Sequence, residues 1–262
     1  MIGFCPLASG SKGNCLYLGT AQTKVLIDLG LSVKAATERL AQIGVTPSEI
    51  DAILITHEHI DHVRGLDVWS SKWNTPIFAN GDTAKALLST TTRKLSLKIF
   101  STGESFQWKD LLIHPFSIQH DAVDPVAFTF HIDSVKLGVC ADLGIATSLV
   151  IHQLQKCDFL YIEANHEPSM VHASPRPLVY KQRVLSRQGH LSNEACARLI
   201  EAIYHLDLKH IYLAHLSSEC NSPDLALQMI QTKLDQLQSQ ATLCLALQDR
   251  ISEPVLFQLV CR

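Results

Sequence analysis

The chain has 262 residues, of which 47% are hydrophobic and 18% charged, and its formal net charge is −3. This balance is typical of a globular protein with an ample core, and it excludes a disordered chain. No apolar run approaches the ~20 residues of a membrane span, and the first residues lack a basic leader followed by an apolar core. The sequence therefore predicts one domain, residues 1–262, in the cytoplasm and without a membrane partner.

Apolar periodicity predicts short strands in the first half, interrupted by three helices. The strands are expected near residues 2–7, 14–19, 24–29, 51–56, 76–79, 97–101, 111–118, 126–132 and 135–141, and the helices near 33–42, 62–70 and 82–90. In the second half helices are expected near 146–155, 174–187, 192–205 and 222–238, and strands near 158–163, 209–214, 242–247 and 254–260. Such a series predicts an α/β (α+β) fold with two mixed sheets and helices outside, a four-layer αββα sandwich.

The run Thr56-His57-Glu58-His59-Ile60-Asp61-His62 directly follows the apolar strand near 51–56. His57 and His59 are two residues apart, so in an extended segment their side chains lie on the same side and can bind one cation. Asp61 and His62 follow where a helix can begin, and they turn toward a second cation. Imidazole and carboxylate are the ligands of catalytic zinc and related metals. The alternatives are chance clustering of the chain's 13 histidines, helix capping or surface pairing.

This run resembles the His-x-His-x-Asp-His signature of the metallo-β-lactamase superfamily. The resemblance implies further site residues, each after an apolar strand. They are Asp28, which would orient the histidine loop, His120 as third ligand of the first metal, Asp142 as the bridging aspartate, and His215 as the last ligand of the second metal. The eight cysteines occur singly, without a Cys-x-x-Cys pair, and are expected to be reduced and buried. A ligand role for Cys140 is disfavoured because the histidine–aspartate set is complete.

Further motifs are similar to the YycJ (WalJ) branch of bacterial metal-dependent nucleases. They are Ala8-Ser9-Gly10-Ser11-Lys12-Gly13-Asn14, His120-Asp121-Ala122-Val123-Asp124-Pro125, Ala141-Asp142-Leu143-Gly144, Glu163-Ala164-Asn165-His166, Gly189-His190-Leu191-Ser192-Asn193 and Ala214-His215-Leu216-Ser217. The resemblance implies a phosphodiesterase that acts on nucleic acid, with DNA as the expected partner, in the manner of a 5′-to-3′ exodeoxyribonuclease. Two divalent ions, Zn²⁺ or Mn²⁺, would act through a metal-bridging hydroxide. Asp61 is then expected to be catalytic as well as a ligand.

His190 is not needed in either metal shell. It resembles the histidine of the Ser-Gly-His motif in ribonuclease J-like enzymes, which contacts the scissile phosphate and assists protonation of the leaving group. The alternative is a histidine that caps the helix beginning near Leu191. We predict that His190 is catalytic.

Other residues are predicted to contact substrate. Arg176, Lys181, Arg183 and Arg187 bring four positive charges to a segment without acidic residues between Glu167 and Glu194. They could follow a phosphate backbone, or they could form an ordinary solvated face. The turn-rich loop near residue 10 could present backbone N–H groups to a terminal phosphate, or be only a hairpin turn, and Asn165 could line the site or a surface turn. The predicted contacts are Ser9, Ser11, Asn14, Asn165, Arg183, Arg187 and Asn193.

Two other functional classes remain open. A small-molecule hydrolase for a cyclic phosphodiester or a thioester would use the same metals, although the long 168–189 segment and the Gly-His-Leu-Ser-Asn motif argue against a thioesterase. A binding module without metal is disfavoured by the complete ligand set. A β-lactamase is disfavoured because true ones are typically secreted and lack the histidine that follows the aspartate in the metal loop.

Overall fold

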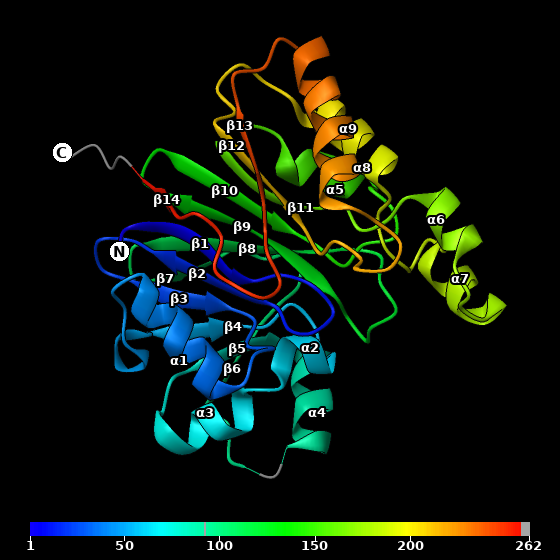
Figure 1. Ribbon diagram of the computed structural model, residues 1–262. Helices are drawn as coiled ribbons and strands as arrows, with labels where there is room; N and C mark the ends of the chain where they lie inside the picture. Colours follow the sequence, from blue (N-terminus) through cyan, green and yellow to red (C-terminus); the bar gives the residue numbers. More distant parts are fainter. Residues whose placement is uncertain (92, 258–262) are drawn as a thin grey trace.

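Two seven-stranded sheets pack face to face in the computed structural model, which describes residues 1–91 and 93–257 (Figure 1). Helices cover both outer surfaces, so the four-layer αββα sandwich predicted from the sequence is confirmed. None of the helices within the described ranges is long and apolar enough to cross a bilayer.

The first sheet has the strand order β14-β1-β2-β3-β4-β5-β6. Its strands are β1 (Gly3–Ala8), β2 (Cys15–Gly19), β3 (Lys24–Ile27), β4 (Ala52–Leu54), β5 (Ile77–Asn80), β6 (Leu97–Phe100) and β14 (Val255–Leu256). From β3 to β6 neighbouring strands are parallel, whereas β14, β1, β2 and β3 pair antiparallel. Because parallel strands end at the same edge of a sheet, the segments after β3 and β4 emerge together.

The second sheet has the order β13-β12-β11-β10-β9-β8-β7. Its strands are β7 (Phe106–Trp108), β8 (Leu111–Ser117), β9 (Val126–Ile132), β10 (Val135–Cys140), β11 (Phe159–Glu163), β12 (His210–Ala214) and β13 (Thr242–Leu245). The strands from β10 to β13 are parallel, so Asp142, Glu163 and His215 all lie at their carboxyl ends. Ligands commonly bind at this edge of parallel sheets.

Three apolar layers hold the sandwich together. Side chains such as Phe4, Phe128 and Tyr212 fill the space between the sheets, and two further clusters lie under the helices. The helices are α1 (Val33–Gln42), α2 (Ile60–Val63), α3 (Leu66–Lys72), α4 (Gly81–Thr90), α5 (Ser148–Leu154), α6 (Pro168–Ala173), α7 (Leu178–Val184), α8 (Asn193–Ile203) and α9 (Pro223–Gln236), with a 3₁₀ turn at Pro47–Glu49. Helices α1, α3 and α4 cover the first sheet, and α5, α8 and α9 cover the second.

Two predicted helices are interrupted in the structure. The helix predicted near 62–70 is divided into α2 and α3 at Gly65, whose N–H bonds the Leu29 carbonyl; a Cβ there would lie 2.5 Å from the Leu31 oxygen. The helix predicted near 174–187 is only α7, because Pro175 and Pro177 exclude a helical conformation before residue 178. Helices α6 and α7 project from the side of the sandwich (Figure 1).

Two strand predictions were also inaccurate. The three-residue strand β7 was not predicted, since its alternation is too short to stand out. The strand predicted near 254–260 is only Val255–Leu256 among the residues that the structure describes, and residues 258–260 lie outside them.

Candidate metal centre

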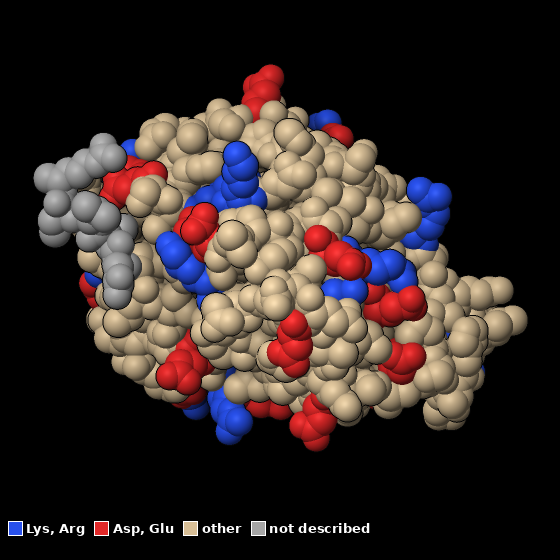
Figure 2. Space-filling view, turned by 90° about the horizontal axis from the view of Figure 1, so that it is seen from above, with Lys and Arg blue, Asp and Glu red and all other residues tan. Residues whose placement is uncertain are grey.

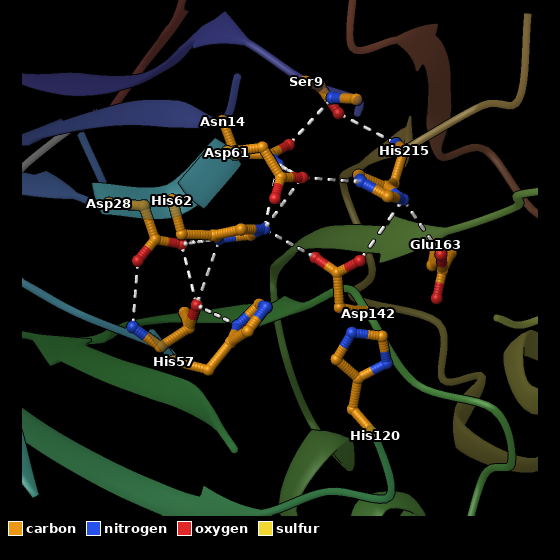
Figure 3. A network of polar contacts seen from close by, with 12 residues as sticks. Ser9, Asn14, Asp28, His57, Asp61, His62, His120, Asp142, Glu163 and His215 are labelled. Carbon is orange, nitrogen blue, oxygen red and sulfur yellow. Dashed lines mark hydrogen bonds and ion pairs between the residues drawn. The ribbon is translucent and has the colours of Figure 1, made fainter. Parts of the chain in front are cut away.

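Residues 56–62, which we call the metal loop, follow the carboxyl end of β4 and are held in place by hydrogen bonds to Asp28. The Thr56 N–H and hydroxyl donate to the Asp28 carboxylate at 2.9 and 2.8 Å, and His62 Nδ1 donates to it at 2.7 Å. Because the Thr56 hydroxyl proton is directed to Asp28, its oxygen accepts from His57 Nδ1 at 3.0 Å. One buried carboxylate thereby sets the ring orientation of two histidines, with Nε2 of each facing away (Figure 3).

Three histidines form the first cluster at this edge. His57, His59 and His120 bring one nitrogen each to within 4.8 Å of one another. His120 Nδ1 donates to the Gly189 carbonyl at 3.1 Å, which fixes its tautomer and leaves the lone pair on Nε2, 3.3 Å from Asp121 Oδ1. The predicted ligand set of the first metal is therefore brought together from loops that follow β4 and β8.

The second cluster adjoins the first. Three further groups each offer ligand atoms within 4.8 Å of one another. They are Asp61, His62 and His215; His57, His62 and Asp142; and Asp142, Glu163, His190 and His215. His62 Nε2 lies 3.0 Å from Asp142 Oδ2, and His215 Nε2 lies 3.9 Å from Asp61 Oδ2 (Figure 3). Because the His57 group shares a residue with the first cluster, the loop residues and Asp142 line one continuous centre.

The free nitrogens of this centre fit a cation. Nε2 of His57 and of His215 is buried and has no hydrogen-bond partner anywhere in the described residues. Burial, with the nearby His62, lowers the pKa of His57 well below its usual range, so its imidazole is neutral and has a lone pair to offer. A buried, unpaired polar atom is costly, and a bound metal would satisfy both nitrogens.

The carboxylates of the centre are ionised despite their burial. Burial alone would raise the pKa of Asp142, but His215 and His62 lower it well below the usual range. Burial likewise opposes ionisation of Asp61, and His215 and His62 outweigh it to lower its pKa. Burial opposes the charge of His62, but Asp28 and Asp142 raise its pKa to about 10. The centre is thus arranged for a positive charge between its carboxylates, which a metal supplies in place of imidazole protons.

Three residues of the centre have left-handed backbones. Asp28, Asp142 and His215 have φ values of 59°, 57° and 53°, and each follows a parallel strand of the inner layers. This conformation is uncommon for residues other than glycine, and its strain is often retained at functional sites. The sharp turn aims each side chain back toward the space between the sheets.

Glu163 is a site residue that we did not assign from the sequence. It is fully buried at the end of β11, where its Oε2 accepts from the backbone N–H of Leu143 at 2.8 Å and of Leu191 at 3.3 Å. Its Oε1 accepts from His190 Nδ1 at 2.8 Å and from His215 Nδ1 at 3.2 Å. The resemblance placed Asp142 and His215 after apolar strands, and Glu163 likewise ends an apolar strand, which is the signal that could have found it.

His190 does not cap a helix. The N-cap of α8 is Ser192, whose hydroxyl accepts from the Ala195 N–H. His190 instead donates to Glu163 and lies 3.5 Å from Asp142, with its side chain 18% exposed. It also lines a cleft of about 570 Å³ together with Arg187 and Ser192. The capping alternative is therefore wrong, and His190 stands between the candidate metal ligands and an open cleft.

Comparisons with known proteins agree with this arrangement. Residues 8–146 match the metallo-beta-lactamase superfamily. The chain belongs to the metallo-beta-lactamase superfamily. It is 35% identical over 238 residues to the exodeoxyribonuclease YycJ of Bacillus anthracis, covering 89% of both chains. It is 37% identical over 234 residues to the exodeoxyribonuclease WalJ of Streptococcus pneumoniae serotype 2, covering 88% of this chain and 87% of that one. Within the superfamily it therefore belongs to the YycJ and WalJ group.

Solved structures of superfamily members show the same fold. The metallo-beta-lactamase fold protein YhfI of Bacillus subtilis has a TM-score of 0.72 at 14% identity, covering 95% of this chain and 98% of that one. The short form of human tRNase Z has a TM-score of 0.62 at 15% identity, with coverages of 95% and 98%. At such low identity these likenesses concern the fold alone.

The predicted contacts in the loop between β1 and β2 divide into two kinds. The Ser9 hydroxyl is buried, bonds to Tyr161 Oη at 2.7 Å and accepts from the His215 N–H at 2.8 Å. It therefore stabilises the backbone at His215 and does not face a substrate. Asn14 Nδ2 lies 2.9 Å from His62 Nε2, beside the metal position. Ser11 is exposed at the tip of the loop. The expected set of free N–H groups is not formed, because the N–H groups of residues 9, 10, 12, 13 and 14 bond within the protein.

The other predicted contacts also vary in their placement. Asn165 Nδ2 donates to the His215 carbonyl at 2.6 Å, and Asn193 is fully buried and bonds Asn221, so both stabilise loops. Arg183 forms an ion pair with Asp121, beside His120. Arg187 lines the His190 cleft. Of these four residues, Arg187 is the one whose side chain lies open to a ligand.

Two of the four cations of the basic segment, Arg176 and Arg183, are paired with carboxylates. Arg176 pairs with Glu219, and Lys181 Nζ donates to the His172 carbonyl at 2.7 Å. Residues 176, 183 and 187 do not lie on one helix, because α7 covers only Leu178–Val184. The segment therefore offers a phosphate backbone much less free charge than its composition indicated.

Seven cysteines lie in the described part of the chain, and all are free. Cys140 is fully buried, and burial raises the pKa of its thiol well above the usual range, so it is not a thiolate. It belongs to none of the metal-binding groups found within the described residues. Its exclusion from the ligand set agrees with the sequence prediction.

We expect Asp28→Asn to weaken metal binding by about ten- to a hundredfold, because an amide cannot accept from Thr56 and His62 together at full charge. Asparagine tolerates the left-handed backbone at this position, so the fold should persist. Competition for the metal with a chromophoric chelator measures the affinity, and circular dichroism checks the fold. Unchanged affinity in the folded variant would contradict the orienting role of Asp28.

Proposed function

We propose that this protein is a binuclear metal-dependent phosphodiesterase that removes nucleotides from DNA, as a 5′-to-3′ exodeoxyribonuclease. The supporting observation is the overlap of the candidate ligand groups, which share His57, His62, Asp142 and His215 and so favour two adjacent ions. Similarity to the exodeoxyribonucleases YycJ and WalJ, over nearly nine-tenths of each chain, supports DNA as substrate.

The proposed ligands are His57, His59 and His120 for one ion and Asp61, His62 and His215 for the other, with Asp142 between them. Zn²⁺ and Mn²⁺ both suit this nitrogen and carboxylate set. When bound, two such ions supply a nucleophile near neutral pH and neutralise charge on a phosphoryl oxygen. We also propose a cytoplasmic location, which the free thiols of the described cysteines support.

We propose that His190 donates a proton to the leaving oxygen. Its Nδ1–H is held by the Glu163 carboxylate at 2.8 Å, and this contact fixes the ring beside Asp142. An alkoxide leaves poorly unless it is protonated, and a held imidazole can supply the proton from Nε2. The cleft that His190 shares with Arg187 gives the departing nucleotide a place next to this nitrogen.

The proposal is tested with 5′-phosphorylated, end-labelled single- and double-stranded DNA in Zn²⁺ or Mn²⁺. We expect stepwise release of nucleotides by the wild type, and loss of both metal and activity in Asp61→Ala. His190→Ala should retain its metal content and lose about 10²–10⁴ in rate. Asp82→Asn, which removes an exposed carboxylate on α4, serves as control.

A different result would identify the alternative class. Turnover of a cyclic phosphodiester or a thioester by the metal-loaded wild type, with no cleavage of either DNA, would assign the protein to small-molecule hydrolysis. A His190→Ala variant with the wild-type rate would remove His190 from the proposed mechanism.

A further inference from the structure

A groove of about 680 Å³ lies between α1 and the α2–α3 segment, on the outer side of the first sheet. Its lining carries three cations, Lys34 from α1, Arg64 from the end of α2 and Lys72 from α3. Glu38 is the carboxylate that faces them. In a chain whose formal net charge is −3, this is a local excess of positive charge. We call it the α1–α3 groove.

The cations of the α1–α3 groove form no close ion pair with a described carboxylate, although Lys72 Nζ lies 5.7 Å from the centre of the Trp73 ring. Within residues 1–91 and 93–257, neither Arg64 nor Lys72 forms an ion pair with a carboxylate. Lys34 lies 4.0 Å from Glu38, with side chains 87% and 62% exposed, and so exposed a pair contributes little. These charges remain available to a ligand, unlike Arg176 and Arg183, which are paired.

The groove begins where the metal loop ends. Arg64 follows His62 by two residues, and its Nη1 donates to the Lys12 carbonyl at 3.1 Å. Two residues after Lys12, the Asn14 N–H donates to the Asp61 carbonyl at 2.7 Å, and its side chain lies beside His62. Lys12 is exposed and adds a cation to the loop that joins Arg64 to the centre. These contacts link the groove to the loop that packs against Asp61 and His62.

Other features of the groove suit a sugar–phosphate chain. Val68 is 51% exposed within it and offers an apolar surface to sugars. The first turn of α1 faces it, with Ser32 at the N-cap, and the positive end of the helix dipole adds to the lysine charge. The opposite face of the molecule differs. Viewed from the side of α8 and α9, acidic and basic side chains are interspersed without a continuous basic area (Figure 2).

We propose that the α1–α3 groove binds the phosphate backbone of the DNA strand whose end is hydrolysed at the metal centre. The proposal rests on the nuclease function proposed above and assigns its substrate path. It replaces the 176–187 segment as the main backbone-binding surface. Lys34 and Lys72 are assigned one phosphate contact each, and Arg64 and Lys12 connect the path to the centre.

The test compares Lys34→Gln/Lys72→Gln with the control Lys98→Gln/Lys156→Gln, which removes the same charge from exposed lysines outside the groove. Binding of 5′-phosphorylated, 3′-fluorescein single-stranded DNA is followed by anisotropy between 50 and 200 mM KCl, with the metal chelated to prevent turnover. A plot of log K against log salt has a negative slope, and each lost phosphate contact should make it shallower by about 0.7. The groove variant, which loses two contacts, should therefore have a slope shallower by about 1.4. Its affinity at 0.1 M salt should fall on the order of tenfold.

Hydrolysis of the small diester bis(p-nitrophenyl) phosphate by the metal-loaded enzymes distinguishes a loss of DNA binding in the groove from a loss of catalysis at the metal centre. The groove variant should keep the wild-type rate on this small diester, because none of its changed residues lies in the candidate centre. A wild-type slope in the groove variant, or an equal loss in the control, would overturn the groove assignment alone. A wild type that neither binds nor cleaves DNA would overturn the nuclease proposal together with it.

Discussion

Asp142→Asn is expected to lower hydrolytic activity by about a thousandfold while the protein stays folded. Asp142 is buried between His62 Nε2 at 3.0 Å and His215 Nδ1 at 3.4 Å, and it belongs to two of the overlapping ligand groups. An amide keeps the shape but not the charge that would hold two ions together. Losing about 4 kcal/mol of transition-state stabilisation corresponds to about a thousandfold in rate.

Asparagine is the appropriate replacement because it tolerates the φ of 57° at this position better than alanine. The matched control is Asp133→Asn, an exposed aspartate in the turn between β9 and β10 with a φ of 51°. Metal content by mass spectrometry and rate on DNA are measured for both variants. Full metal content with the wild-type rate in Asp142→Asn would show that this carboxylate is not a ligand.

The sequence carries a local signal for one part of the candidate centre. His57, His59, Asp61 and His62 lie in one run after an apolar strand, and strand periodicity alone places the first two together. The more distant ligands depend on topology, since nothing in their spacing brings His120 or His215 to that run. The resemblance to the superfamily supplied that topology, and the parallel order of β10 to β12 realises it.

Partner choice is the step that a sequence does not determine. A basic segment near 176–187 is visible in the composition, but Glu219 and Asp121, which pair with Arg176 and Arg183, come from distant parts of the chain. Lys34, Arg64 and Lys72 are scattered in sequence and become one surface only when α1 packs beside α3. For the same reason Ser9, in a loop typical of phosphate contacts, is turned inward to Tyr161.

Glu163→Gln is expected to reduce turnover by about a hundredfold or more through the two histidines that it holds. The N–H groups of Leu143 and Leu191 require an oxygen at the Oε2 position, so the amide –NH₂ would replace Oε1. Facing an N–H donor, Nδ1 of His190 and of His215 would have to become an acceptor, which moves each proton to Nε2. His215 Nε2 would then lose the lone pair that a metal needs.

The size of this effect can be divided between the two histidines by a double-mutant cycle. If Glu163 acts mainly through His190, then Glu163→Gln in the His190→Ala background should cost little more than His190→Ala alone. A loss that instead follows metal content, measured in parallel, would assign the effect to His215. Glu167→Gln, four residues further along, removes a partly exposed carboxylate that belongs to none of the candidate ligand groups and should leave rate and metal content unchanged. Additive losses at full metal occupancy would show that Glu163 acts through neither ring. In the double variant His190 is absent, and full metal content would show that His215 still binds. A residue that only positions these two rings would then have no further effect on the rate.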